Sequence, residues 1–151
     1  MRIKELIQSD TKQAMLAGDK DKAAVLQSIK SAFLDYEITA KKRDEGLSDE
    51  DAMNILAKEA KKRQESADLY RRGGSETQAE AEEYEKEIIE SYLPDSLSDE
   101  ELQALVDAEV SKLDAPSPKD MGGVIANVRQ AAGPSADGAI IASKVKEALQ
   151  Q

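Results

Sequence analysis

The chain has 151 residues, of which 40% are hydrophobic, 34% are charged and 3% are aromatic, a composition typical of helices with wide solvated faces. The absence of Cys and His excludes disulfides, thiolate or imidazole metal ligands, a cysteine nucleophile and a Ser-His catalytic pair. The formal net charge of −10 disfavours indiscriminate binding to DNA or RNA, so that only a local basic patch would contact a structured RNA.

Four helices are predicted in the first part of the chain from the spacing of apolar residues and from capping residues. Gly18-Asp19 indicates a stop followed by a new N-cap. Ser48 resembles the start of a capping box with acidic residues in the next turn. In chain order, the helices are expected from about Arg2 to Leu16, after Asp19 toward Lys42, after Ser48 until Gly73-Gly74, and from about Thr77 to Pro94.

Three shorter helices are predicted in the tail. The capping box Ser98-Asp99-Glu100-Glu101 opens the first, and Ser117-Pro118 places Pro at the first position of the second. Gly133-Pro134 ends the second helix, and apolar residues spaced four apart indicate the third: Ile141, Val145 and Leu149. The expected fold is all-α, with an N-terminal unit of about four helices at residues 1–93 and a small three-helix tail domain at 94–151.

The expected location is the cytoplasm. No stretch approaches the roughly 18 consecutive apolar residues that a membrane span needs. The N-terminus opens with a charged amphipathic segment rather than a signal peptide. We therefore expect no membrane partner.

Several strings of the sequence resemble the YqeY family. The run from Tyr92 to Leu102 is similar to the family's Y-L-P-x-x-L-S-x-E-E-L signature, the most specific string in the chain. Lys61-Lys62-Arg63, followed by Ser66 and Tyr70, resembles its K-x-R-x-x-S-x-x-x-aromatic run. Two tail strings resemble its M-G-x-V and A-D-G elements, Met121-Gly122 with Val124 and Ala136-Asp137-Gly138. The strings occur in the family's order over nearly the whole chain.

The resemblance implies an N-terminal helical unit followed by a helical tail related to the C-terminal domain of the amidotransferase subunit GatB. In GatB, the role attributed to that tail is to engage tRNA. The family is also labelled as a carbon–nitrogen ligase with glutamine as amido-N donor. Since the sequence shows no catalytic constellation, the label leaves open whether this chain is an enzyme.

Basic residues of the tail are the candidates for RNA binding if the GatB-like role holds. Basic residues contact phosphates by charge and hydrogen bonding, and the tail has few of them after Lys112. Gln27 stands where the family commonly has Arg, and Gly133-Pro134-Ser135 replaces a Gly followed by a basic residue. Both departures remove positive charge. The candidate RNA-binding residues are Lys119, Arg129, Lys144 and Lys146.

Two further groups of residues each have a functional and a structural interpretation. Gly122, Asp137 and Gly138 are candidates for a loop that approaches a ligand closely, and they equally suit turns and an Asp N-cap. Lys61-Lys62-Arg63 is a candidate anion or RNA phosphate site. The structural alternative is a half-buried Arg63 that pairs with a helix carboxylate. The acidic residues of the fourth helix lack a metal-binding pattern, so no metal site is predicted.

We hypothesise from the sequence a non-catalytic module that binds tRNA or a component of an aminoacyl-tRNA amidotransferase or synthetase, without a cofactor. One alternative is a protein-interaction or scaffold domain with no RNA role, which the net charge of −10 favours. Another is an accessory subunit that changes the turnover of a glutamine-dependent amidotransferase only in complex.

Overall fold

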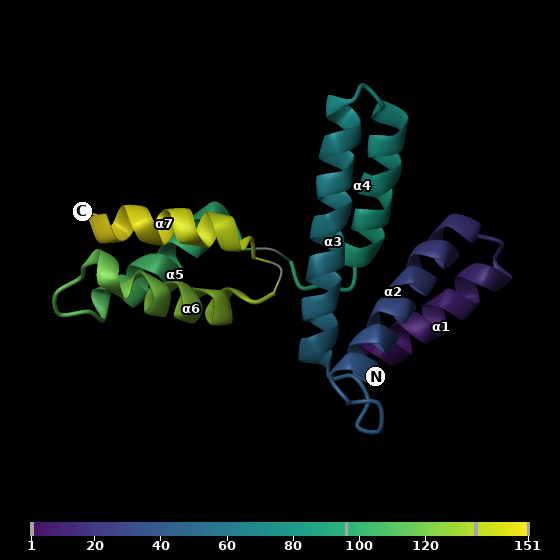
Figure 1. Ribbon diagram of the computed structural model, residues 1–151, viewed down its shortest axis with the longest axis horizontal. Helices are drawn as coiled ribbons and strands as arrows, with labels where there is room; N and C mark the ends of the chain where they lie inside the picture. The colour runs from purple at the N-terminus through teal and green to yellow at the C-terminus, as the bar shows by residue number, and fades with distance from the viewer. Residues whose placement is uncertain (1, 96, 135, 151) are drawn as a thin grey trace. The chain divides into compact units, whose positions relative to one another are not determined.

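The structure is a computed structural model that describes residues 2–95, 97–134 and 136–150, and Figure 1 shows its helices. Every regular element in these ranges is helical, which confirms the all-α prediction. The α-helices are α1 (Ile3–Leu16), α2 (Lys20–Thr39), α3 (Asp49–Arg72), α4 (Glu76–Glu90), α5 (Asp99–Ser111), α6 (Met121–Ala132) and α7 (Gly138–Gln150); the short 3₁₀ helix η1 (Pro118–Asp120) precedes α6.

The chain folds as two compact units, residues 1–94 and 95–151. The first unit contains α1 to α4, and the second unit contains α5, η1, α6 and α7. Each unit has its own cluster of buried apolar side chains. The identities expected from the sequence, a YqeY N-terminal domain and a GatB/YqeY-type tail domain, stay predictions.

The first unit consists of two helical hairpins, α1 with α2 and α3 with α4 (Figure 1). Gly18 adopts a left-handed backbone conformation with φ of 76° at the end of α1, and the Lys22 backbone N–H donates to the Asp19 carboxylate at 3.2 Å to cap α2. The two hairpins share one core. Its buried residues are Ile7, Val25, Leu26, Ile29, Phe33, Leu47, Ala52, Leu56, Ala60 and Ile89.

The end of α2 differs from the prediction. The helix ends at Thr39 rather than near Lys42, because Lys41 takes a left-handed conformation with φ of 56°. The Lys42 ammonium then lies 3.2 Å from the Asp51 carboxylate and 5.9 Å from the centre of the Tyr36 ring. The hydrogen bond to Asp51 raises the pKa of Lys42. Lys42 therefore joins the segment after α2 to the first turn of α3.

Two long-range hydrogen bonds hold α1 in the first unit. The Ile3 backbone N–H donates to the Asp49 carboxylate at 2.9 Å, so the first turn of α3 satisfies a free N–H group of α1. The Tyr92 hydroxyl donates to Asp10 Oδ2 at 2.6 Å. Since α4 ends at Glu90, before the predicted Pro94, Tyr92 lies in the segment that follows the helix and reaches α1 from there.

We expect Tyr92 to make the first unit less stable at high pH. Burial, together with the hydrogen bond to Asp10, raises the pKa of Tyr92 above its ordinary value of 10.0. The folded chain keeps the phenol proton after the unfolded chain has lost it, so this contribution to stability is complete below about pH 10 and is lost as the pH rises further. In Tyr92→Phe this contribution disappears, and the free energy of unfolding should fall less steeply above pH 10.

The measurement is urea unfolding at pH 8 to 11, with native-state absorbance of the phenolates as a second observable. Tyr84→Phe is the control because the Tyr84 side chain is exposed. A Tyr92→Phe protein with the same alkaline slope as the wild type would contradict the prediction.

The second unit packs α5, α6 and α7 around a smaller core. The Glu101 backbone N–H donates to Ser98 Oγ at 3.1 Å, so Ser98 caps α5. Contrary to the prediction, Pro118 does not stand at the first position of the second tail α-helix. It begins the 3₁₀ helix η1, which the Asp120 carboxylate closes by accepting from the Ser117 backbone N–H at 3.0 Å. The buried residues are Leu102, Val106, Val124, Val128, Ile141, Val145 and Leu149.

Candidate functional site

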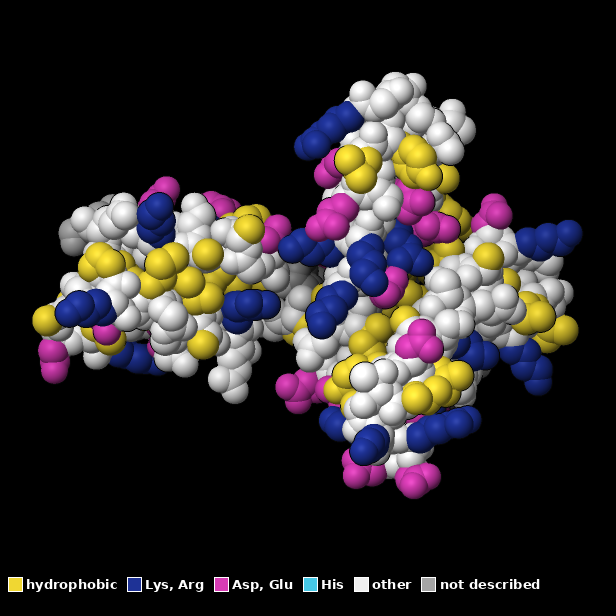
Figure 2. All heavy atoms as spheres, viewed as in Figure 1, with side chains coloured by type: hydrophobic (Ala, Val, Ile, Leu, Met, Phe, Trp, Pro, Cys, Tyr) yellow, Lys and Arg dark blue, Asp and Glu magenta, His cyan; other side chains and the backbone are white. Residues whose placement is uncertain are grey.

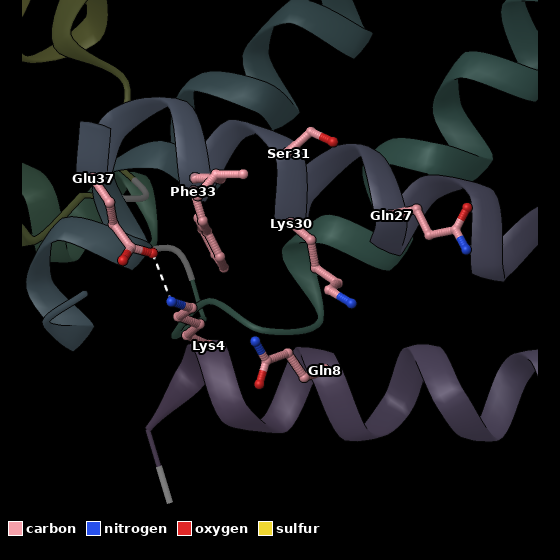
Figure 3. Close-up of a pocket in the computed structure, with 8 residues that line it drawn as sticks. Lys4, Gln8, Gln27, Lys30, Ser31, Phe33 and Glu37 are labelled. Atoms are coloured by element: carbon pink, nitrogen blue, oxygen red, sulfur yellow. Dashed lines mark hydrogen bonds and ion pairs between the residues drawn. The ribbon is translucent and has the colours of Figure 1, made fainter. Parts of the chain in front are cut away.

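A groove with a cavity volume of about 390 Å³ lies between α1 and α2, and Figure 3 shows the side chains that surround it. Its volume falls within the range of roughly 300–1,000 Å³ that is usual for ligand sites. The groove belongs entirely to the first unit. Its lining residues are Lys4 and Gln8 of α1 and Gln27, Lys30, Ser31, Phe33, Leu34 and Glu37 of α2.

Helical periodicity explains why these side chains meet. The α2 positions recur at intervals of three or four residues, and so do Lys4 and Gln8 on α1, which places each set on one face of its helix. Phe33 is 1% exposed and belongs to the core, so it forms an apolar floor. Leu34 is 42% exposed and widens that apolar surface. The groove combines an apolar floor with polar walls.

A partly buried ion pair lies at one end of the groove. Lys4 Nζ lies 2.7 Å from Glu37 Oε1, as the dashed line in Figure 3 marks. The Glu37 side chain is 2% exposed and that of Lys4 is 30% exposed. Because a buried carboxylate without a partner is strongly unfavourable, the pair fixes the Lys4 ammonium at the groove wall.

Lys30 gives the groove an excess of positive charge. The lining contains two ammonium groups, those of Lys4 and Lys30, and one carboxylate, that of Glu37, which already pairs with Lys4. In Figure 3 the Lys30 side chain extends from α2 into the space above Gln8. Its ammonium is therefore placed to meet an anionic group, and the Gln8 and Gln27 carboxamides can donate hydrogen bonds beside it.

The four predicted RNA-binding residues of the tail differ in exposure and in pairing. Lys119, Arg129 and Lys146 have exposed side chains. Lys144 is 14% exposed, with its ammonium 2.8 Å from Asp99 Oδ1 and 3.4 Å from Gln103 Oε1. On the visible face of the second unit, Figure 2 shows basic side chains set apart from one another by uncharged ones.

The candidate ligand-approach residues Gly122, Asp137 and Gly138 lie at two places in the second unit. Asp137 Oδ1 accepts from the Ala139 backbone N–H at 2.8 Å, and Gly138 begins α7, where a Cβ would lie 3.6 Å from Arg129 Cζ. Gly122 precedes Arg129 by seven residues on α6, about 10 Å along the helix axis. The observed geometry of Asp137 is that of a helix cap.

Arg63 connects three helices of the first unit. Its guanidinium pairs with Glu59 on α3 at 2.5 Å and with Glu85 on α4 at 3.6 Å, and it donates to Ser28 Oγ on α2 at 3.2 Å. Its side chain is only 17% exposed. Burial, followed by the nearby Glu82, raises the pKa of Glu85, whereas Arg63 opposes this increase.

The neighbours of Arg63 are more accessible. Lys61 is exposed, and Lys62 is exposed with its ammonium 3.3 Å from Glu59 Oε1. Figure 2 shows basic side chains gathered over the middle of α3. The Arg63 guanidinium is thus engaged inside the first unit, and only Lys61 and Lys62 of this triplet present their charges to the surroundings.

The described residues contain neither a metal-ligating cluster nor a membrane-spanning helix. Among the described residues, no group of three or more acidic side chains is arranged to hold a metal ion. Within residues 2–95, 97–134 and 136–150, no helix is both long enough and apolar enough to span a membrane.

The groove is not predicted by the sequence patterns. Its lining residues form no recognised motif as a set. A usable signal was the helical spacing of Gln27, Lys30, Ser31 and Leu34, which places three polar side chains and one leucine on the same face of the helix.

These features define a small, all-helical protein of two compact units, with a positively charged groove in the first. The family model described as Yqey-like protein matches residues 4–149, nearly the whole chain, and the chain belongs to this family. No curated protein was found that matches the sequence.

Proposed function

We propose that this protein is a non-catalytic binding module that holds a protein component of the aminoacyl-tRNA machinery, an amidotransferase or synthetase subunit. The main observation in support of this proposal is the groove between α1 and α2. Its apolar floor at Phe33 and Leu34 and its polar walls match the mixture of surfaces found where proteins bind one another. The resemblance of the tail to GatB supports the aminoacyl-tRNA machinery as the source of the partner.

Charge supports a protein partner over RNA at this site. The groove has one ammonium in excess, whereas single-stranded RNA sites combine a continuous basic path with exposed aromatic platforms. Phe33 is 1% exposed, so its ring cannot stack on a base.

The test is the affinity of the full chain for purified amidotransferase and synthetase subunits, measured by calorimetry. Leu34→Asp places a carboxylate at the groove and should weaken binding at least tenfold, because it removes apolar contact and reverses the local charge. Leu69→Asp is the matched control, since Leu69 is 66% exposed and lies on α3 outside the groove. Absence of binding to every such subunit would overturn the proposed function.

A second candidate function is direct contact with tRNA by the second unit. The exposed cations Lys119, Arg129 and Lys146 favour it. Replacing all three with Ala should abolish binding to total tRNA at low salt, and the wild-type affinity should fall as salt increases. Lys144→Ala is the comparison, because Lys144 already pairs with Asp99 and should contribute little. Unchanged tRNA binding in the triple variant would contradict this candidate.

A further inference from the structure

The groove between α1 and α2 is elongated. Gln27 and Glu37 line it and are ten residues apart on α2, which corresponds to about 15 Å along the helix. At the Gln27 end, the carboxamide lies 3.6 Å from Met15 Sδ of α1, and the Lys4–Glu37 pair stands at the other end. The length is close to three turns of an α-helix.

Exposed apolar side chains continue from the groove along α2. Leu34 is 42% exposed and Ile38 is 55% exposed, and the two are one helical turn apart. Lys30 precedes Leu34 by four residues, so its ammonium lies on the same stripe. The surface therefore presents a positive charge, then an apolar pair, at the spacing of one helix turn.

Backbone hydrogen bonding favours a helical ligand over an extended one. An extended peptide commonly binds by adding a strand to a free sheet edge, whereas the interior backbone groups of α1 and α2 are paired within each helix. A groove between two helices is the usual receptor for the apolar face of a third helix. The Lys30 ammonium and the Gln8 and Gln27 amides then determine which polar side chain the bound helix carries beside its apolar face.

We propose that the groove binds an acidic amphipathic helix of a partner protein. One carboxylate of this helix contacts Lys30, and an apolar side chain four residues away contacts Leu34 and Ile38. The proposal rests on the proposed function, in which the groove holds a protein partner, and it adds the chemistry of the segment that is recognised. Apolar contact provides most of the affinity, and Lys30 provides the selection of an acidic segment.

The experiment uses the full chain and designed helical peptides as probes. Each peptide has leucines spaced three and four residues apart, and the set differs only in having Glu, Gln or Lys four residues from the central leucine. The Glu peptide should bind at least fivefold more tightly than the Gln peptide at low salt. Lys30→Glu should reverse the order, so that the Lys peptide binds most tightly, and Lys30→Gln should remove the preference.

Lys12→Glu is the matched control, because Lys12 is exposed on α1 and does not line the groove. It should keep the preference for the Glu peptide. Amide resonances of Gln8, Lys30 and Leu34 should shift when that peptide is added. Equal affinity for the three peptides, or a preference that Lys30→Glu leaves unchanged, would overturn the proposal. Self-association that Lys30→Glu abolishes, without peptide binding, would replace the partner with a second copy of this chain.

The outcomes separate this proposal from the proposed function. The chain could bind the Glu peptide selectively and yet have no affinity for any amidotransferase or synthetase subunit. That result would overturn the proposed function and support the acidic helix as the ligand. Binding to such a subunit that is insensitive to Lys30→Glu and Lys30→Gln would retain the function and overturn the acidic-helix proposal.

Discussion

Replacing Leu56 with Ala should lower the free energy of unfolding of the first unit by about 2–5 kcal/mol. Leu56 is 0% exposed and belongs to the core shared by the two hairpins. Truncation removes apolar contacts and leaves a cavity that close-packed neighbours fill only in part. All tyrosines of the chain lie in the first unit, so tyrosine fluorescence during urea unfolding reports on this unit; they are Tyr36, Tyr70, Tyr84 and Tyr92.

Leu69→Ala is the control for Leu56→Ala. Leu69 lies on the same helix but is 66% exposed, so the same substitution should change stability by no more than about 0.5 kcal/mol. The comparison keeps residue type, helix and helix propensity constant and changes burial alone. Similar destabilisation by the two substitutions would show that Leu56 is not in the core of the folded chain.

Replacing Lys4 with Met should destabilise the first unit by about 1–3 kcal/mol, because it leaves the Glu37 carboxylate buried without its partner. The Glu37 side chain is 2% exposed, whereas that of Lys4 retains 30% exposure. Water that reaches the vacated position keeps the loss below the roughly 3–5 kcal/mol measured for fully buried pairs. Unfolding in urea, followed by tyrosine fluorescence, gives the value.

A double-mutant cycle identifies the cause of this loss. Adding Glu37→Leu to Lys4→Met removes the unpaired carboxylate and should restore most of the stability, since apolar replacement of a buried pair is commonly neutral or favourable. Lys12→Met on the exposed surface of α1 is the control and should have little effect. Failure of the double variant to regain stability would assign the loss to packing of the Lys4 side chain instead.

Helix starts were predictable because their determinants lie within a few residues. Asp19 and Ser98 accept hydrogen bonds from backbone N–H groups three residues later, and a short sequence window contains both partners. The end of α2 was not predicted, because it depends on Lys41 entering a left-handed conformation without Gly. That conformation accompanies the contact of Lys42 with Asp51, which belongs to the next helix.

The candidate site was harder to predict because its parts come from different helices. Lys4 and Glu37 are 33 residues apart, and neither belongs to a motif. In the tail, the type and position of Lys144 suggested a phosphate contact, but its ammonium pairs with Asp99 on α5. Pairings of this kind follow from how helices pack, and periodicity within one helix cannot reveal them.

The hydrogen bond between Tyr92 and Asp10 determines which part of the first unit can fold early during synthesis on the ribosome. The two residues are 82 positions apart, so at synthesis rates of about 5–20 residues per second Asp10 is synthesised roughly 4–16 s before its partner. The α1–α2 hairpin closes a short loop and can form during that interval, but its final attachment awaits the segment after α4. Nascent chains stalled before Tyr92 should therefore expose α1 to proteolysis more than chains stalled far enough along for Tyr92 to have left the ribosome.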